Sequence, residues 1–235
     1  GAGAVAIGFH NVAGPLNSDE SSIPTSGNTT NLGQFAVGYG TQATGHVAFS
    51  AGQSTTASGY ASTAIGNYTI ASDYGSMVIG QYNSSGSSAT SATSFSTSAP
   101  AFVIGNGTSG SLSDAFKVMF NGDTTISNDL TVSGDVVVSS DARLKANIVS
   151  LGSTLSKLLL IDGKSYVMKK DGKQKIGVLA QDIQEVFPEL VTKDDNEMLA
   201  VNYQGLVPVL INALKEQDEK ISKLEKLVEQ LISEK

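Results

Sequence analysis

Between residues 35 and 90, apolar and polar positions repeat every fourteen residues. The four blocks read FAVGYGTQATGHVA, FSAGQSTTASGYAS, TAIGNYTIASDYGS and MVIGQYNSSGSSAT. Two small-residue positions recur: Gly38, Gly52, Gly66 and Gly80 at one, and Ala43, Ala57 and Ala71 with Ser85 at the other. Residues 4–8, AVAIG, look like an earlier copy followed by an insertion around residues 14–33. A fixed period this short predicts a β-solenoid of stacked coils.

A flexible Gly/Ser/Thr-rich linker is the alternative interpretation of this composition. A linker would not keep Val37, Ile65 and Ile79 in register, each directly before a block glycine. One coil holds too few apolar residues to bury a core, so the coils must stack.

The next segment predicts further, less regular β structure. Residues 83–100 are rich in Ser, Thr and Ala and indicate a loop, after which residues 101–105, AFVIG, resume a strand pattern. The run AFKVMF at 115–120 precedes the turn signal Asn121-Gly122-Asp123 and predicts a hairpin. Apolar residues then alternate with polar ones at Ile126, Leu130, Val132 and Val136–Val138. We expect a narrow, intertwined β shaft that needs trimerisation to bury enough surface.

Charge and element type change together near residue 139. The first 139 residues carry one basic residue, Lys117, and seven acidic ones, whereas the last 96 carry fourteen basic and fifteen acidic residues. The first part therefore offers no basic patch, and we expect no nucleic-acid partner.

The last 96 residues have the pattern of an α+β domain. Leu151, Leu155, Leu158 and Leu159 fall at helix spacing. Residues 165–168 with the Gly172 turn predict a hairpin, and residues 176–187 predict a strand passing into a short helix limited by Pro188.

From about residue 207 to 235 the pattern is that of a coiled coil. The two apolar seams are Val207, Leu214, Ile221 and Val228, and Leu210, Gln217, Leu224 and Leu231. A single amphipathic surface helix is the alternative. Four heptads favour self-association, and they do not choose between a dimer and a trimer.

Composition excludes several kinds of chemistry. The chain has no Cys and two His, so we expect neither a metal site nor a cofactor. No apolar run is long enough to cross a membrane and no signal peptide is visible, so we expect no membrane insertion. The chain begins without Met, inside a repeat, and reads as the C-terminal piece of a longer protein.

Two families are similar to parts of this chain. Roughly residues 35–82, with the pattern STAIG at 62–66 followed by Ala71-Ser72, resemble the head repeats of trimeric autotransporter adhesins. That resemblance implies a left-handed parallel β-roll and a trimer with three rolls side by side. Residues 140–235 closely resemble the endosialidase-type intramolecular chaperone, a self-cleaving domain at the end of phage tail fibres and tailspikes. The motifs are SDARLKANI at 140–148, IGVLAQ at 176–181, VFPELV at 186–191, VNY at 201–203 and the coiled coil.

The chaperone resemblance implies a catalytic dyad of Ser140 and Lys145 that cuts the Ser139–Ser140 bond. A Ser hydroxyl becomes a nucleophile when a base accepts its proton, and a neutral Lys amine can be that base. Arg143 or backbone amides are candidate donors to the oxyanion. By spacing alone, a helix N-cap among surface charges is the better interpretation of Ser140 and Asp141. Asp141 could orient a partner in the active form or cap the next element, and we favour the cap.

The sequence thus predicts an all-β trimeric fibre followed by an α+β chaperone domain that ends in a long coiled-coil helix. The expected parts are a β-roll head at 1–100, a neck or shaft at 101–139 and the chaperone at 140–235. The function expected is that of a viral tail fibre or spike, in the virion, with a host-surface receptor or glycan as partner. A cellular surface adhesin with the same parts is the alternative.

A polysaccharide hydrolase is a third hypothesis, and the first 139 residues show no paired carboxylates for it. A glycan site could also use Tyr39, Tyr60, Tyr68, Tyr74, Tyr82 and His46. Decoration of the solenoid surface or packing between chains is the simpler interpretation of these side chains.

Overall fold

The computed structural model describes residues 4–14, 33–194 and 197–234. The chain divides into two compact units, residues 1–137 and residues 138–235, here called the N-terminal and C-terminal units. Most of the insertion expected around residues 14–33 lies outside the described residues.

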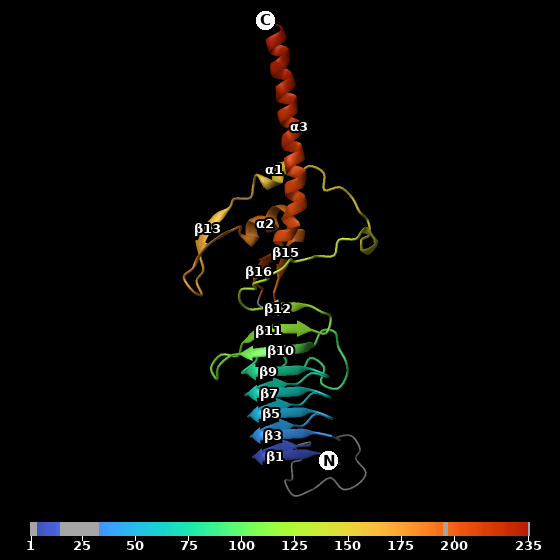
Figure 1. Ribbon diagram of the computed structural model, residues 1–235, viewed down its shortest axis with the longest axis vertical. Helices are drawn as coiled ribbons and strands as arrows, with labels where there is room; N and C mark the ends of the chain where they lie inside the picture. The colour runs from blue at the N-terminus through green and yellow to red at the C-terminus, as the bar shows by residue number, and fades with distance from the viewer. Residues whose placement is uncertain (1–3, 15–32, 195–196, 235) are drawn as a thin grey trace. The chain divides into compact units, whose positions relative to one another are not determined.

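The N-terminal unit is a two-sheet solenoid (Figure 1). Its main sheet contains, in spatial order, β1 (Val5–Phe9), β3 (Phe35–Tyr39), β5 (Phe49–Gln53), β7 (Thr63–Asn67), β9 (Met77–Gln81), β10 (Pro100–Asn106), β11 (Asp114–Met119) and β12 (Thr124–Ile126). The small sheet contains β2 (Val12–Ala13), β4 (Gln42–Ala43), β6 (Thr56–Ala57) and β8 (Ile70–Ala71). Strands pair in parallel from β1 to β10 and from β2 to β8. Each of the four coils that begin with β1, β3, β5 and β7 gives one strand to each sheet, and β9 continues the main sheet. This confirms the fourteen-residue repeat and the earlier copy at residues 4–8.

Glycine stacks on glycine along the main sheet, and only glycine fits there. The register aligns Gly8, Gly38, Gly52, Gly66, Gly80 and Gly105. At Gly66, φ is +128°, and a Cβ would lie 2.0 Å from the carbonyl oxygen of Gly80. Any side chain would therefore meet both a strained backbone and an occupied space. Neighbouring coils can approach this closely only if each of these aligned positions is glycine.

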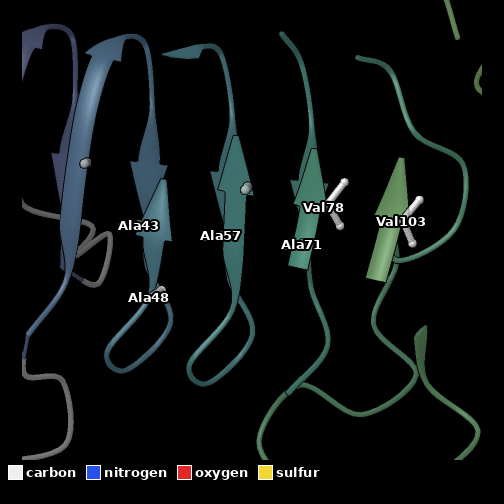
Figure 2. Close-up of a cluster of buried hydrophobic side chains, with 8 residues drawn as sticks. Ala43, Ala48, Ala57, Ala71, Val78 and Val103 are labelled. Atoms are coloured by element: carbon white, nitrogen blue, oxygen red, sulfur yellow. The ribbon is translucent and has the colours of Figure 1, made fainter. Parts of the chain in front are cut away.

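The interior between the two sheets is narrow and lined by small side chains. Figure 2 shows Ala43, Ala57 and Ala71 on successive strands of the small sheet, with Val78 and Val103 at one end of the cluster. The fully buried polar residues include Thr41, Ser50, Thr55, Ser62 and Thr69. Some of them bond within a coil, as Ser50 Oγ does with Thr55 Oγ1 at 2.6 Å.

Because strand side chains alternate between faces, the larger apolar residues of the main sheet point outward. They lie at the two outward positions flanking the buried residue of each strand. We call the following set the apolar stripe: Phe35, Val37, Phe49, Ile65, Met77, Ile79, Phe102 and Ile104. All eight are half-buried or exposed, and the Phe35 and Phe49 rings stack at 5.4 Å. The solenoid thus has its small residues inside and a band of large apolar residues outside.

The small sheet ends at β8, and side chains there make the hydrogen bonds that the backbone of another coil would make. The Asn83 amide accepts from the backbone N–H of Ile70 at 2.8 Å and donates to its carbonyl at 2.9 Å, which covers the free edge of β8. Asp73 stands where earlier coils have glycine, and its Oδ1 accepts from the backbone N–H of Thr90 and Ser91, each at 2.6 Å. Residues 83–99 form no strand, as the loop prediction expected.

The predicted hairpin is present, but the shaft beyond it is not formed within one chain. β11 pairs antiparallel with both β10 and β12. Residues 127–139 contain no strand, and Val136, Val137 and Val138 are 64%, 89% and 60% exposed. The intertwined β shaft expected through Val138 stays a prediction, because it requires three chains and these residues have no strand of their own chain beside them.

The C-terminal unit combines two hairpins, two short helices and one long helix (Figure 1). Its elements are α1 (Leu155–Leu158), β13 (Lys164–Val167), β14 (Gln174–Gly177), α2 (Ala180–Val186), β15 (Val191–Lys193), β16 (Leu199–Val201) and α3 (Leu206–Ser233), with 3₁₀ turns at Ala142–Leu144, Pro188–Leu190 and Tyr203–Gly205. Ile183, Phe187, Leu190 and Val209 form its small core. The predicted hairpin and short helix are confirmed. The helix expected from Leu151 begins only at Leu155, after Gly152 takes a φ of +65°.

The long C-terminal helix is confirmed, and its two apolar seams are uncovered. The exposed seam residues are Val207, Leu210, Leu214, Ile221, Leu224, Val228 and Leu231, each between 45% and 65% exposed. The coiled-coil pairing of this helix stays a prediction.

We predict that Gly66→Ala strongly destabilises the solenoid. The new Cβ would collide with the carbonyl of Gly80 at a positive φ, at a cost of at least about 2 kcal/mol per chain. Thermal melting followed by circular dichroism should show a clear drop in the midpoint. Gly110→Ala is the matched control, since nothing lies within 4 Å of a Cβ there. Equal melting of the two variants would contradict the close-stacking argument.

Candidate active site at the start of the C-terminal unit

The two predicted catalytic residues lie together at the start of the C-terminal unit. Lys145 Nζ donates a hydrogen bond to Ser140 Oγ at 2.7 Å. Both residues are exposed in the single chain. The predicted scissile bond, Ser139–Ser140, belongs to an exposed segment without regular structure. The geometry is that of a nucleophile in contact with a candidate base.

A short 3₁₀ turn over Ala142–Leu144 brings these two residues together. Asp141 caps the turn, because its carboxylate accepts a hydrogen bond from the backbone N–H of Arg143 at 2.8 Å. The cap favoured for Asp141 is thus confirmed. Lys145 returns to extended backbone, and its N–H donates to the carbonyl of Ala142 at 3.1 Å.

The guanidinium of Arg143 binds the same carboxylate. Its Nε donates to both oxygens of Asp141 at 3.1 Å, and Nη2 donates to Oδ2 at 2.7 Å. These hydrogen bonds lower the pKa of Asp141 and raise that of Arg143, because each favours the charged form of the group. The oxyanion role considered for Arg143 finds no support in these contacts, since the guanidinium is directed at Asp141.

The aromatic residues considered for a glycan site stack on one another between coils. His46, Tyr60 and Tyr74 form one column with centroids 4.9 Å apart, and Tyr68 stacks on Tyr82 at 4.8 Å. Tyr39 stacks on Phe9 at 5.7 Å. The inner ring faces are therefore occupied by neighbouring rings of the same chain, a stacking between coils that the sequence did not predict.

Glu216 has a role that the heptad pattern did not reveal. Glu216 lies outside the two apolar seams of that pattern. In the structure its carboxylate accepts hydrogen bonds from Ser153 Oγ at 2.6 Å, from the backbone N–H of Thr154, and from that of Leu155 at 3.0 Å. These bonds, that from Ser153 foremost, lower the pKa of Glu216. Glu216 thus fastens the start of α1 to α3, and no local sequence signal points to a contact 60 residues away.

Metal-binding clusters and membrane-spanning helices are two further features on which the sequence raised an expectation. Among the described residues, no three His, Cys, Asp or Glu side chains gather in a way that could hold a metal ion. Within the same residues, no helix combines the length and hydropathy needed to cross a membrane.

Comparison with known proteins finds two similarities. Residues 140–192 match the family model described as chaperone of endosialidase, a peptidase family. The C-terminal unit is therefore similar to this family from Ser140 onward. The chain is also 36% identical over 84 residues to the long tail fiber protein Gp37 of Escherichia phage AR1. That alignment covers 32% of this chain and 8% of the relative, so the chain corresponds to only a small part of that protein's length.

We predict a pH-dependent contribution of Glu216 to the stability of the C-terminal unit. Since folding lowers the pKa of Glu216, its contribution is present above the ordinary value of 4.5 and is lost as the pH falls through the lowered value. Glu216→Gln should lower the melting midpoint of the helical signal at pH 7, and the difference from the parent should shrink by pH 3.

This comparison is best made in a Ser140→Ala parent, so that all chains stay intact. Glu219→Gln is the control, because Glu219 lies one turn along the same helix. An equal effect of Glu216→Gln at both pH values would contradict the charge-based contribution.

Proposed function

We propose that this chain is the C-terminal part of a trimeric, phage-type tail fibre or spike, built with its own folding chaperone. Residues 1–139 are the fibre, which belongs to the virion and meets a host-surface receptor or glycan. Residues 140–235 assemble three chains, guide their folding and then leave by cutting the Ser139–Ser140 bond. The family match at residues 140–192 and the similarity to a phage long tail fibre support this proposal.

The observation that carries the proposal is the 2.7 Å contact between Ser140 and Lys145. It lies where the charge pattern changes and where the family match begins. A surface Ser–Lys contact alone would be unremarkable. At this boundary it supplies a nucleophile and a base beside the bond that separates the fibre from the chaperone.

The proposed reaction is an acyl transfer followed by hydrolysis. Neutral Lys145 accepts the proton of Ser140 Oγ, and the oxygen attacks the carbonyl carbon of Ser139. The C–N bond to Ser140 breaks, its nitrogen takes the proton, and an ester joins the Ser139 carbonyl to Ser140 Oγ. Water then hydrolyses the ester, leaving a carboxyl group on Ser139 and restoring the hydroxyl of Ser140. Each chain reacts once, because the nucleophile leaves with the released part.

Exposure of the dyad gives a reason why cutting should await assembly. A lysine amine accepts a proton only when neutral, and burial or nearby cations favour that form. Ser140 and Lys145 are both exposed in the single chain, and the nearby cation Arg143 is already bound to Asp141. We propose that packing among three chains supplies the missing burial, so that cutting follows trimerisation.

Two uncovered apolar surfaces support a trimer. The apolar stripe crosses five neighbouring strands of the main sheet, from β3 to β10, without a charged residue. The seams of α3 carry Leu and Ile that are half or more exposed. Large exposed apolar patches mark association sites. Copies of the same chain meet both needs, with stripes packed together in a left-handed β-roll head and helices packed in a coiled coil.

A chaperone is needed because β structure shared among three chains forms slowly and misassembles readily. A coiled coil at the chain end raises the local concentration of the three fibre segments. Cutting then removes the assembly device, so that the fibre is held by the barrier to its unfolding.

The repeats would equally suit a cellular surface adhesin that uses the same parts. The similarity to a phage tail fibre favours the virion.

We predict that the intact chain yields fragments of 139 and 96 residues, the smaller one starting at Ser140. Ser140→Ala and Lys145→Ala should each leave a single full-length band, because one lacks the nucleophile and the other the base. Denaturing gels with N-terminal sequencing of the smaller band make the measurement. Ser139→Ala is the matched control and should still be cut, since its side chain takes no part. A different new N-terminus, or normal cutting of Ser140→Ala, would refute the proposal.

A further inference from the structure

We infer that Asp141 is a positioning residue for the proposed self-cleavage: it caps the turn that carries Lys145 onto Ser140. The inference rests on the proposed function and adds a residue to it. Asp141 itself touches neither the Ser140 hydroxyl nor the Lys145 amine in any described contact. Its effect passes through the backbone between them.

Ser140 and Lys145 are five residues apart in the sequence. Five residues of extended backbone span roughly 16–18 Å, so Ser140 and Lys145 would point away from each other in an extended segment. Instead, Lys145 Nζ lies 2.7 Å from Ser140 Oγ. The 3₁₀ turn over Ala142–Leu144 provides the necessary shortening.

Backbone and side-chain hydrogen bonds hold that turn. A three-residue 3₁₀ helix is weak on its own, because it contains few hydrogen bonds for the backbone that it orders. Its backbone hydrogen bonds run from Leu144 N–H to the Asp141 carbonyl and from Lys145 N–H to the Ala142 carbonyl, each 3.1 Å. All residues of the turn are exposed, so no buried side chain contributes. The Asp141 carboxylate adds a third bond by accepting from the Arg143 N–H at 2.8 Å.

Asp141 caps a backbone N–H and also forms an ion pair with Arg143. Capping a backbone N–H is a neutral acceptor's task, which Asn performs about as well as Asp. The ion pair with Arg143 is exposed, with side-chain exposures of 89% for Arg143 and 43% for Asp141, and such pairs contribute little. The cap therefore contributes more to the stability of the turn than the ion pair with the guanidinium does.

These contributions give a graded expectation for the rate of cutting. Asp141→Ala should slow it roughly 3- to 30-fold, the effect of losing an N-cap on the population of the turn. Asp141→Asn should stay within about threefold of the wild type, because it keeps the acceptor. Arg143→Ala should also stay within about threefold, because residue 143 keeps its backbone N–H.

The measurement is the cleavage time course of pulse-labelled full-length chains made in a cell-free extract, followed at several pH values on denaturing gels. If Asp141 acts by positioning, its loss lowers the cleavage rate on the plateau of the pH profile. The pH midpoint of that profile stays the same. Light scattering of the same substitutions in a Lys145→Ala parent, which stays uncut, should show unchanged assembly.

Asp171→Ala is a closely matched control. Asp171 also accepts the backbone N–H of the residue two positions on, Lys173, at 3.1 Å, and also forms an ion pair with that residue's side chain. It lies in the β13–β14 hairpin rather than beside the dyad, so this variant should cut at the wild-type rate.

Several results would overturn the inference. One is cleavage of Asp141→Ala at the wild-type rate, and another is an equal loss of cleavage rate in Asp141→Asn and Asp141→Ala. The others are a shifted midpoint of the pH profile of cleavage, or a failure of assembly that accounts for the lost cleavage. If the wild type is cut at Ser139–Ser140 and only the Asp141 variants disagree, this inference fails while the proposed function stands. If Ser140→Ala is cut like the wild type, the proposed function itself fails.

Discussion

The close stacking of glycine on glycine between neighbouring coils is the constraint on which the N-terminal unit depends. With a Cβ position only 2.0 Å from the next coil's carbonyl oxygen, no other residue can occupy the row. The same tight coil leaves an interior that holds Ala, Ser and Thr and little larger. The large apolar side chains must therefore face outward, where they form the apolar stripe. A single chain folded in this way exposes apolar surface to water, which is unfavourable.

The C-terminal unit also leaves apolar surface uncovered. Its core is small, and the long helix shows both apolar seams to solvent. In the proposed mechanism, partner chains cover those seams and bury the dyad. Burial favours the neutral form of a lysine, which the proposed reaction needs, so one physical requirement would link cutting to assembly. The role inferred for the Asp141 cap is to set how often the nucleophile and base face each other.

The features that follow from local sequence were predictable, and those that depend on distant contacts were not. The fourteen-residue register, the hairpin before Asn121 and the long helix all rest on spacing or turn signals, and each is present. The structure brings Ser140 and Lys145 into contact, whereas their role as a dyad comes from a family resemblance and stays a proposal. Glu216 lies outside the apolar seams of the helix, and only the fold shows that it binds the N-terminal end of a helix more than 60 residues earlier. Likewise, only the fold shows that Asp73 and Asn83 close the coils. Residues 127–139 alternate like a strand but have no partner strand within one chain.

The central claim is that residues 1–139 reach their trimeric state through residues 140–235 and keep it afterwards. The most direct test compares purified 1–139 from two routes, separate expression and release from the full chain, by light scattering and thermal melting. The account predicts a folded trimer from the released route and aggregated or monomeric chains from separate expression. Leu224→Lys and Leu231→Lys in the full chain should reduce the yield of trimer without changing the melting of fibre already cut. If separately expressed 1–139 gives the same trimer with the same melting profile and yield, the chaperone role is contradicted.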